Sequence, residues 1–101
     1  MIYQLSVPAA VPGVEEIRVL EWHGEPGTAF ETGDLIVELE THKAVVEARA
    51  GRPGILREIK AGPGDWMAIG LVLALFSDGA DDPLPTGDGP ADDLPIEFEV
   101  T

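Results

Sequence analysis

The sequence predicts an all-β domain, and three observations support this prediction. The chain of 101 residues contains 12 glycines and 9 prolines, a content that favours many turns between short segments. Apolar and polar residues alternate in several short runs, which is the pattern of half-buried strands. No segment keeps helical periodicity for about ten residues or more. A chain of this length can bury one modest core, so we expect a single domain.

The expected strands follow one another with clear turns between them. They comprise residues 2–7, 15–23, 35–39, 45–48, 55–60 and an apolar run at 71–76. Glycine and proline mark turns at 24–27, 52–54 and 61–65. The runs at 35–39 and 45–48 are close enough in sequence to form a β-hairpin with residues 40–44 at its tip.

The chain also resembles itself at an offset of 37 residues. Gly27 then aligns with Gly64 and Gly33 with Gly70, and the apolar residues that follow align as well. A repeat of this kind indicates two similar half-domains. We therefore predict two sheets packed face to face as a flattened barrel or sandwich, with residues 40–44 at the crossover between the halves.

Negative charge is concentrated in the last quarter of the chain. The formal net charge is −13, and residues 77–101 contain eight acidic and no basic side chains. No window offers a basic footprint, so we predict neither a nucleic-acid nor a membrane partner. The boundary that we predict gives a domain at 1–77 and an acidic tail at 78–101.

The tail has too few apolar residues to offset the entropy of ordering it, so we expect it to be disordered. Its exception is the alternating run at 96–100, which could add as a strand to a sheet edge of this protein or of a partner.

The absence of cysteine limits the chemistry that the chain can perform. It excludes disulfides, thiolate metal sites and a thiol nucleophile, and it is typical of a reducing compartment. The sequence contains no apolar run of roughly 20 residues, and its first residues do not show a charged region followed by an apolar one. We therefore expect a soluble, cytoplasmic protein. His23 and His42 have no cluster of carboxylates or cysteines around them in the sequence, so we predict no metal site.

Lys43 stands at the tip of the predicted hairpin. Such tips commonly use glycine or asparagine for positive φ, but residues 40–44 contain neither. The only other lysine, Lys60, follows a strand and does not lie at an apex. The lysine at the tip therefore requires an explanation other than turn chemistry.

Residues 33–44, which read Gly-Asp-Leu-Ile-Val-Glu-Leu-Glu-Thr-His-Lys-Ala, resemble a family signature. Further landmarks in the family's order lie at residues 7–9, 21–27, 54–56 and 64–65. Over roughly residues 4–77 the chain resembles the lipoyl domains of 2-oxo acid dehydrogenase complexes, within the biotinyl/lipoyl attachment superfamily. The resemblance implies two four-stranded antiparallel sheets with quasi-two-fold symmetry, a barrel-sandwich hybrid.

The resemblance also implies a role for the tip. Lys43 would carry lipoic acid through an amide bond, with Glu40, Thr41, His42 and Ala44 as the recognition context. A dithiolane on a long flexible stem can enter the active sites of partner enzymes while the domain stays outside. The domain would thus be a carrier without catalytic residues of its own.

The partners implied are a lipoate ligase or lipoyltransferase and the three components of such a complex. These components are a thiamine diphosphate-dependent dehydrogenase, an acyltransferase and a dihydrolipoyl dehydrogenase. The chain would be either a free-standing carrier or the N-terminal domain of a larger acyltransferase, in which case the acidic tail begins a linker.

His42 departs from the family pattern, which has aspartate before the lysine. The imidazole removes a negative charge from the surface that decides which partner acylates the arm, so we expect His42 to alter partner choice. Two alternatives stay open: a biotin carboxyl carrier, although the methionines that usually flank the biotinyl lysine are absent, and an unmodified structural or assembly module. Trp22 and Trp66 are expected to be core or rim aromatics.

Overall fold

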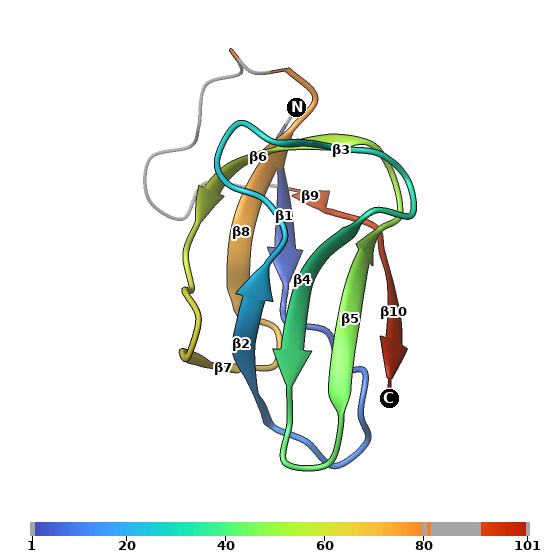
Figure 1. Ribbon diagram of the computed structural model, residues 1–101, viewed down its shortest axis with the longest axis vertical. Coiled ribbons are helices and arrows are strands. Elements are labelled where there is room, and N and C mark those ends of the chain that lie inside the picture. The colour runs from blue at the N-terminus through green and yellow to red at the C-terminus, as the bar shows by residue number, and fades with distance from the viewer. Residues whose placement is uncertain (1, 80, 82–91, 101) are drawn as a thin grey trace.

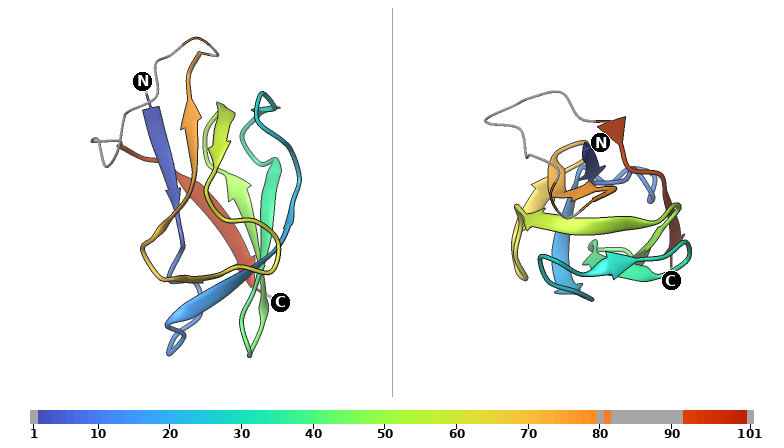
Figure 2. Two further views of the ribbon diagram at one scale, coloured as in Figure 1. Left: turned by 90° about the vertical axis from the view of Figure 1, so that its left-hand side faces the viewer. Right: turned by 90° about the horizontal axis from the view of Figure 1, so that it is seen from above.

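The computed structural model describes residues 2–79, 81 and 92–100, and every regular element in them is a strand. The strands are β1 (Ile2–Ser6), β2 (Glu16–Trp22), β3 (Ala29–Phe30), β4 (Leu35–Glu40), β5 (Val45–Ala50), β6 (Gly54–Ile59), β7 (Trp66–Ala68), β8 (Val72–Ser77), β9 (Asp92–Asp93) and β10 (Ile96–Val100). They form two sheets, in the orders β3-β6-β8-β1-β9 and β10-β5-β4-β2-β7. Figures 1 and 2 show the two sheets as layers of a flattened sandwich.

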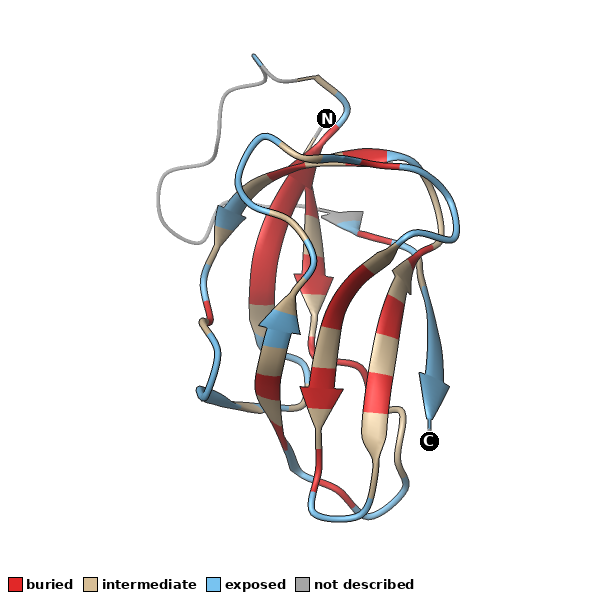
Figure 3. Cartoon of the chain, viewed as in Figure 1, coloured by how far each residue is buried: buried red, intermediate tan, exposed pale blue. Residues whose placement is uncertain are grey.

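The core lies between the two layers, and the alternation of the strands directs side chains into it. In β5 buried and half-buried residues alternate strictly, as a strand with one inward face requires. Figure 3 shows this banding along β5 and a similar one along β2, whereas β10 at the edge of the sheet is largely exposed. The largest fully buried side chains come from both sheets: Phe76, Leu5, Ile17, Ile36, Leu39, Leu56 and Leu73. Burying each of these removes enough apolar surface to stabilise the fold by about 1.5–3 kcal/mol.

The 37-residue offset appears in the structure as a quasi-two-fold axis between the sheets. Gly27 and Gly64 both have positive φ, of 102° and 92°, a conformation that favours glycine. Each also donates its amide hydrogen across to the other half, Gly27 to Leu56 O and Gly64 to Val19 O, both at 2.7 Å. Strand β4 maps onto β8 residue by residue. The two similar half-domains predicted from the sequence are therefore confirmed.

The predicted pair of four-stranded antiparallel sheets forms the body of the fold, as β3-β6-β8-β1 and β5-β4-β2-β7. Each sheet is then extended by one strand from the acidic tail. Strand β9 runs parallel to β1, and β10 runs antiparallel to β5 with Phe98 opposite Ala48 and Val100 opposite Val46. Residues 92–95 are thus ordered, in contrast to the expected disorder, and the alternating run at 96–100 adds as a strand to a sheet edge of this protein, as its pattern allowed, while 80 and 82–91 lie outside the described residues.

Leu94 is the physical reason for the ordered tail. Its side chain is 5% exposed and joins the core, and its amide donates to Gln4 O at 2.8 Å. Pro95, which follows Leu94, is also tied to the body of the fold, because Gly51 N donates to Pro95 O at 2.8 Å. A Cβ at Gly51 would lie 2.7 Å from that same carbonyl oxygen, so glycine is required for this approach. One buried leucine and backbone pairing therefore hold an otherwise acidic segment.

The sandwich has two distinct ends. The β4–β5 hairpin and the loop at residues 7–15 lie at one, which we call the lysine end (Figure 1). The start of β1, the end of β8 and the short loop at 51–53 lie at the other, which we call the far end. The part of the chain that the structure describes contains no helix long and apolar enough to cross a membrane.

Candidate functional site

The hairpin tip is closed by a threonine side chain. Thr41 is 5% exposed, and its Oγ1 accepts hydrogen bonds from the amides of Lys43, at 3.0 Å, and Ala44, at 2.9 Å. Its own amide donates to Ala44 O at 2.8 Å. No residue other than glycine has positive φ in the described chain. This turn therefore needs no positive φ, and the side-chain hydroxyl of Thr41 fixes it by accepting from two backbone amides, which explains how it forms without glycine or asparagine.

The side chains of the two central residues take no part in the hydrogen bonds that close this turn. His42 and Lys43 are both exposed, while Glu40 ends β4 and Ala44 is half-buried at the start of the return. No acidic side chain in the described residues forms an ion pair with the Lys43 ammonium. Lys60, by comparison, lies after β6 with its Nζ 3.9 Å from Glu58. Of the two lysines, Lys43 is therefore the one at a hairpin tip whose amine has no ion-pair partner in the described residues.

The Lys43 side chain lies over the loop at residues 7–15. A methyl group added at Gly13 would come within 3.5 Å of Lys43 Nζ, and Gly13 itself has a φ of 80°. Beside this contact is an open groove of about 490 Å³. Its lining residues are Gly13, Glu15, Glu16, His42 and Trp66. The amine of Lys43 thus lies next to a groove that the loop, the tip, β7 and the start of β2 form together.

A row of side chains on the outer face of the sheet ties the tip to β7. Arg18 lies between Glu40 and Trp66 in the strand register. Its Nη2 is 2.6 Å from Glu40 Oε1, and its guanidinium carbon is 5.8 Å from the centre of the Trp66 ring. Of the site residues predicted from the sequence, Glu40 is therefore a structural partner of β2 as well as a neighbour of the lysine.

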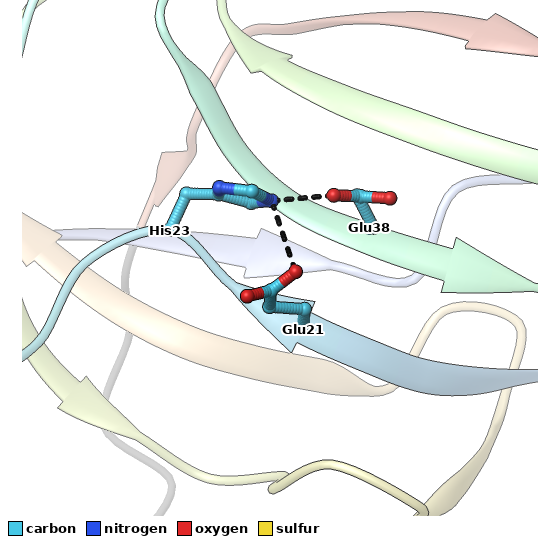
Figure 4. A group of neighbouring side chains, drawn as sticks. All are labelled: Glu21, His23 and Glu38. Carbon is cyan, nitrogen blue, oxygen red and sulfur yellow. Dashed lines mark hydrogen bonds and ion pairs between the residues drawn. The ribbon is translucent and has the colours of Figure 1, made fainter.

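A second cluster on the same sheet lies away from the tip (Figure 4). His23 Nε2 is 2.6 Å from Glu38 Oε1 and 3.9 Å from Glu21 Oε2. The three potential ligand atoms lie within 4.8 Å of one another, a spacing that a divalent cation could bridge. The sequence did not predict this grouping, because Glu21 and Glu38 are brought together only by the register of β2 and β4. The contact with Glu38 gives the imidazole a hydrogen-bond partner.

Fold and tip together define a class of protein. A small rigid sandwich displays one unpaired amine on a tight hairpin, and in the described residues it assembles no nucleophile with an adjacent base. Both the fold and the exposed lysine at the hairpin tip are the features that the resemblance in sequence implies.

The comparisons with known proteins agree with this class. Residues 3–76 match the family described as "Biotin-requiring enzyme". The chain is 33% identical over 86 residues to the dihydrolipoyllysine-residue succinyltransferase component of the 2-oxoglutarate dehydrogenase complex of Bacillus subtilis, a match that covers 82% of this chain and 21% of that protein. It is 30% identical over 83 residues to the acetyltransferase component of the pyruvate dehydrogenase complex of Zymomonas mobilis, covering 81% of this chain and 19% of the relative.

A solved structure extends the likeness to the fold. The lipoyl domain of the 2-oxoglutarate dehydrogenase complex from Azotobacter vinelandii superposes with a TM-score of 0.66 at 31% identity, covering 76% of this chain and 98% of that domain. The chain therefore belongs to the biotin/lipoyl attachment family, as a lipoyl domain of the kind found in 2-oxo acid dehydrogenase acyltransferase components. It spans about a fifth of the length of the curated relatives that it matches.

Proposed function

We propose that Lys43 is the lipoyl attachment site and that the domain is a non-catalytic carrier in a 2-oxo acid dehydrogenase complex. The observation that carries this proposal is the exposed, unpaired Lys43 on a tip that Thr41 closes from beneath. A ligase needs an amine that protrudes and keeps one backbone geometry, and the buried Thr41 hydroxyl supplies that geometry. The residues present therefore fit a lipoyl group.

Lipoic acid, when attached, supplies a disulfide that can accept an acyl group and reducing equivalents at the end of a flexible stem. The protein's contribution is to fix where that stem starts. Strands β4 and β5 bring Glu40 opposite Val45 and so hold the turn rigid, and the sandwich behind them keeps the domain outside its partners' active sites. The partners proposed are a lipoate ligase or lipoyltransferase and the thiamine diphosphate-dependent, acyltransferase and dihydrolipoyl dehydrogenase components.

Intact-mass measurement tests the attachment. We expect protein from a host supplied with lipoate and an active ligase to carry one lipoyl increment, and Lys43→Arg to lose it completely. Lys60→Arg is the matched control, since it removes the other lysine and should leave the increment unchanged. A biotinyl increment would instead identify a biotin carrier, and a persistently unmodified chain would support a structural module.

His42 is the residue through which we propose that this domain selects its partners. Its exposed imidazole stands next to Lys43 and lines the groove beside it. A partner that places its active site over the lysine must therefore contact His42. We expect His42→Asp to change the rate at which a thiamine diphosphate-dependent dehydrogenase acylates the lipoylated domain, and equal rates for the two proteins would contradict this role.

A further inference from the structure

We propose that the groove beside the hairpin tip is a resting site for the lipoyl group of the same chain. This inference rests on the proposed attachment at Lys43 and adds a second contact for the attached group. Between visits to partner enzymes, the dithiolane would lie against Trp66, and its disulfide would be only partly exposed to solvent.

The direction of the lysine side chain supports this placement. Lys43 Nζ, the atom to which the group is joined, already lies over Gly13 and so at the border of the groove. Gly13 has no side chain, and its φ of 80° disfavours any other residue. Gly13 therefore adds no side chain to the groove lining next to the lysine amine.

Trp66 forms an aromatic wall of the groove. Its side chain is 51% exposed on β7, although a tryptophan usually buries most of its large surface. The guanidinium of Arg18, on β2, lies over the Trp66 ring. Arg18 Nη2 is in turn 2.6 Å from Glu40 Oε1, which fixes the guanidinium. The ring is thus supported from one side and available on the other.

The chemistry of the lining favours an uncharged, partly apolar occupant. A volume of about 490 Å³ is within the range of small-molecule sites, roughly 300–1,000 Å³. Glu15 and Glu16 place two carboxylates at the rim, so an anionic ligand would be repelled. An oxidised lipoyl group carries no charge once its carboxyl is an amide, and sulfur makes favourable contacts with aromatic rings. The attached group therefore matches the groove better than a phosphate or a carboxylate would.

Nuclear magnetic resonance of the intact domain tests the proposal. We would record indole N–H signals of the unmodified and fully lipoylated proteins, with the extent of lipoylation confirmed by mass. The Trp66 signal is expected to shift on lipoylation. Trp22 is the internal control, because its Nε1 donates to Ala61 O at 2.8 Å and lies outside the groove.

The outcomes separate this inference from the attachment itself. A complete lipoyl increment with an unchanged Trp66 signal would overturn the resting site and leave the attachment intact. Failure of Lys43 to accept lipoate would overturn both. An equal shift of both indoles would also overturn the resting site, because it would report a general change in the fold.

A rate measurement on a variant provides a second test. In lipoylated Trp66→Thr the dithiolane should spend more time in solvent, so that tris(2-carboxyethyl)phosphine reduces it about two- to tenfold faster than in the parent protein. Threonine keeps β propensity at this exposed position of β7, and Trp66→Phe should give an intermediate rate. Equal rates in a variant that retains the native spectrum elsewhere would contradict the resting site.

Discussion

The two ends of the sandwich differ although the same repeat builds both. The quasi-two-fold axis places Thr41, after β4, in the position of Asp78, after β8. At the lysine end Thr41 closes a turn and leaves a cation unpaired. At the far end Asp78 Oδ1 is 2.5 Å from Arg52 Nη2, and the Arg52 guanidinium also lies over the Tyr3 ring at 4.2 Å.

The loops show the same contrast between the ends. The loop that follows β5 at the far end comprises residues 51–53, whereas its counterpart after β1 at the lysine end comprises residues 7–15. The longer loop brings Gly13 beneath Lys43 and forms part of the groove. The far end thus serves stability, through the Arg52–Asp78 ion pair and the buried Leu94, and the lysine end displays an amine. Four substitutions test this division.

Leu94→Ala should have the largest effect on stability. It removes a buried side chain that closes the far end, and we expect a loss of about 2–3 kcal/mol in the free energy of unfolding. Urea denaturation measures it, and Leu71→Ala is the matched control because Leu71 is half exposed. Lipoylation should persist wherever the variant is folded. A loss below about 0.5 kcal/mol, typical of an exposed site, would mean that the tail is no part of the domain.

Thr41→Val should have an intermediate effect and act on both properties. Two backbone amides lose their acceptor, so we expect a loss of about 1–2 kcal/mol in unfolding free energy. The tip would also open more often, and lipoylation by a purified ligase should slow about tenfold. Thr41→Ser keeps the hydroxyl and should retain most of both. Normal lipoylation of the valine variant would show that the turn does not depend on this side chain.

Arg52→Met should have a smaller effect, confined to the far end. Arg52 and Asp78 are both partly exposed, so their pair together with the aromatic contact contributes only about 0.5–1 kcal/mol. A double-mutant cycle with Asp78→Asn isolates the coupling, which should shrink as salt is added. Coupling that does not respond to salt would indicate packing as its source. The rate of lipoylation is expected to stay unchanged.

Lys43→Gln should have the smallest effect on stability, and it sharpens the comparison most. The side chain is exposed and has no ion-pair partner in the described residues, so the unfolding free energy should change by less than about 0.5 kcal/mol. Modification should be lost entirely by intact mass. A marked destabilisation would show that the lysine end contributes to folding as the far end does.

Much of the body of the fold was predictable because its signals are local or periodic. The expected strand at 55–60 is observed at Gly54–Ile59, and the expected run at 71–76 at Val72–Ser77. The matched glycines were visible in sequence because positive φ leaves little choice of residue. The tip at 40–44 was located by periodicity, as a short interval between two alternating runs.

The features that the sequence did not predict depend on which strands become neighbours. The Trp66 ring meets Arg18 only because β7 pairs with β2. Strand β7 has three residues, which are too few to be predicted from alternation. Thr41 was predicted only as recognition context, and that its hydroxyl closes the tip could not be read from the sequence. The average composition of the tail is acidic and poor in apolar residues, which favours disorder. The burial of one side chain, Leu94, in the core is not visible in that average.

The strand β10 has a consequence for how copies of this protein meet. Without it β5 would be the outer strand of its sheet, with a row of open backbone groups that could pair with another molecule. With it the outermost strand alternates glutamate with apolar residues, Glu97 and Glu99 lying on either side of the exposed Phe98. A second copy approaching that edge would bring carboxylates against carboxylates. The acidic tail therefore places two carboxylates on the sheet edge that it forms.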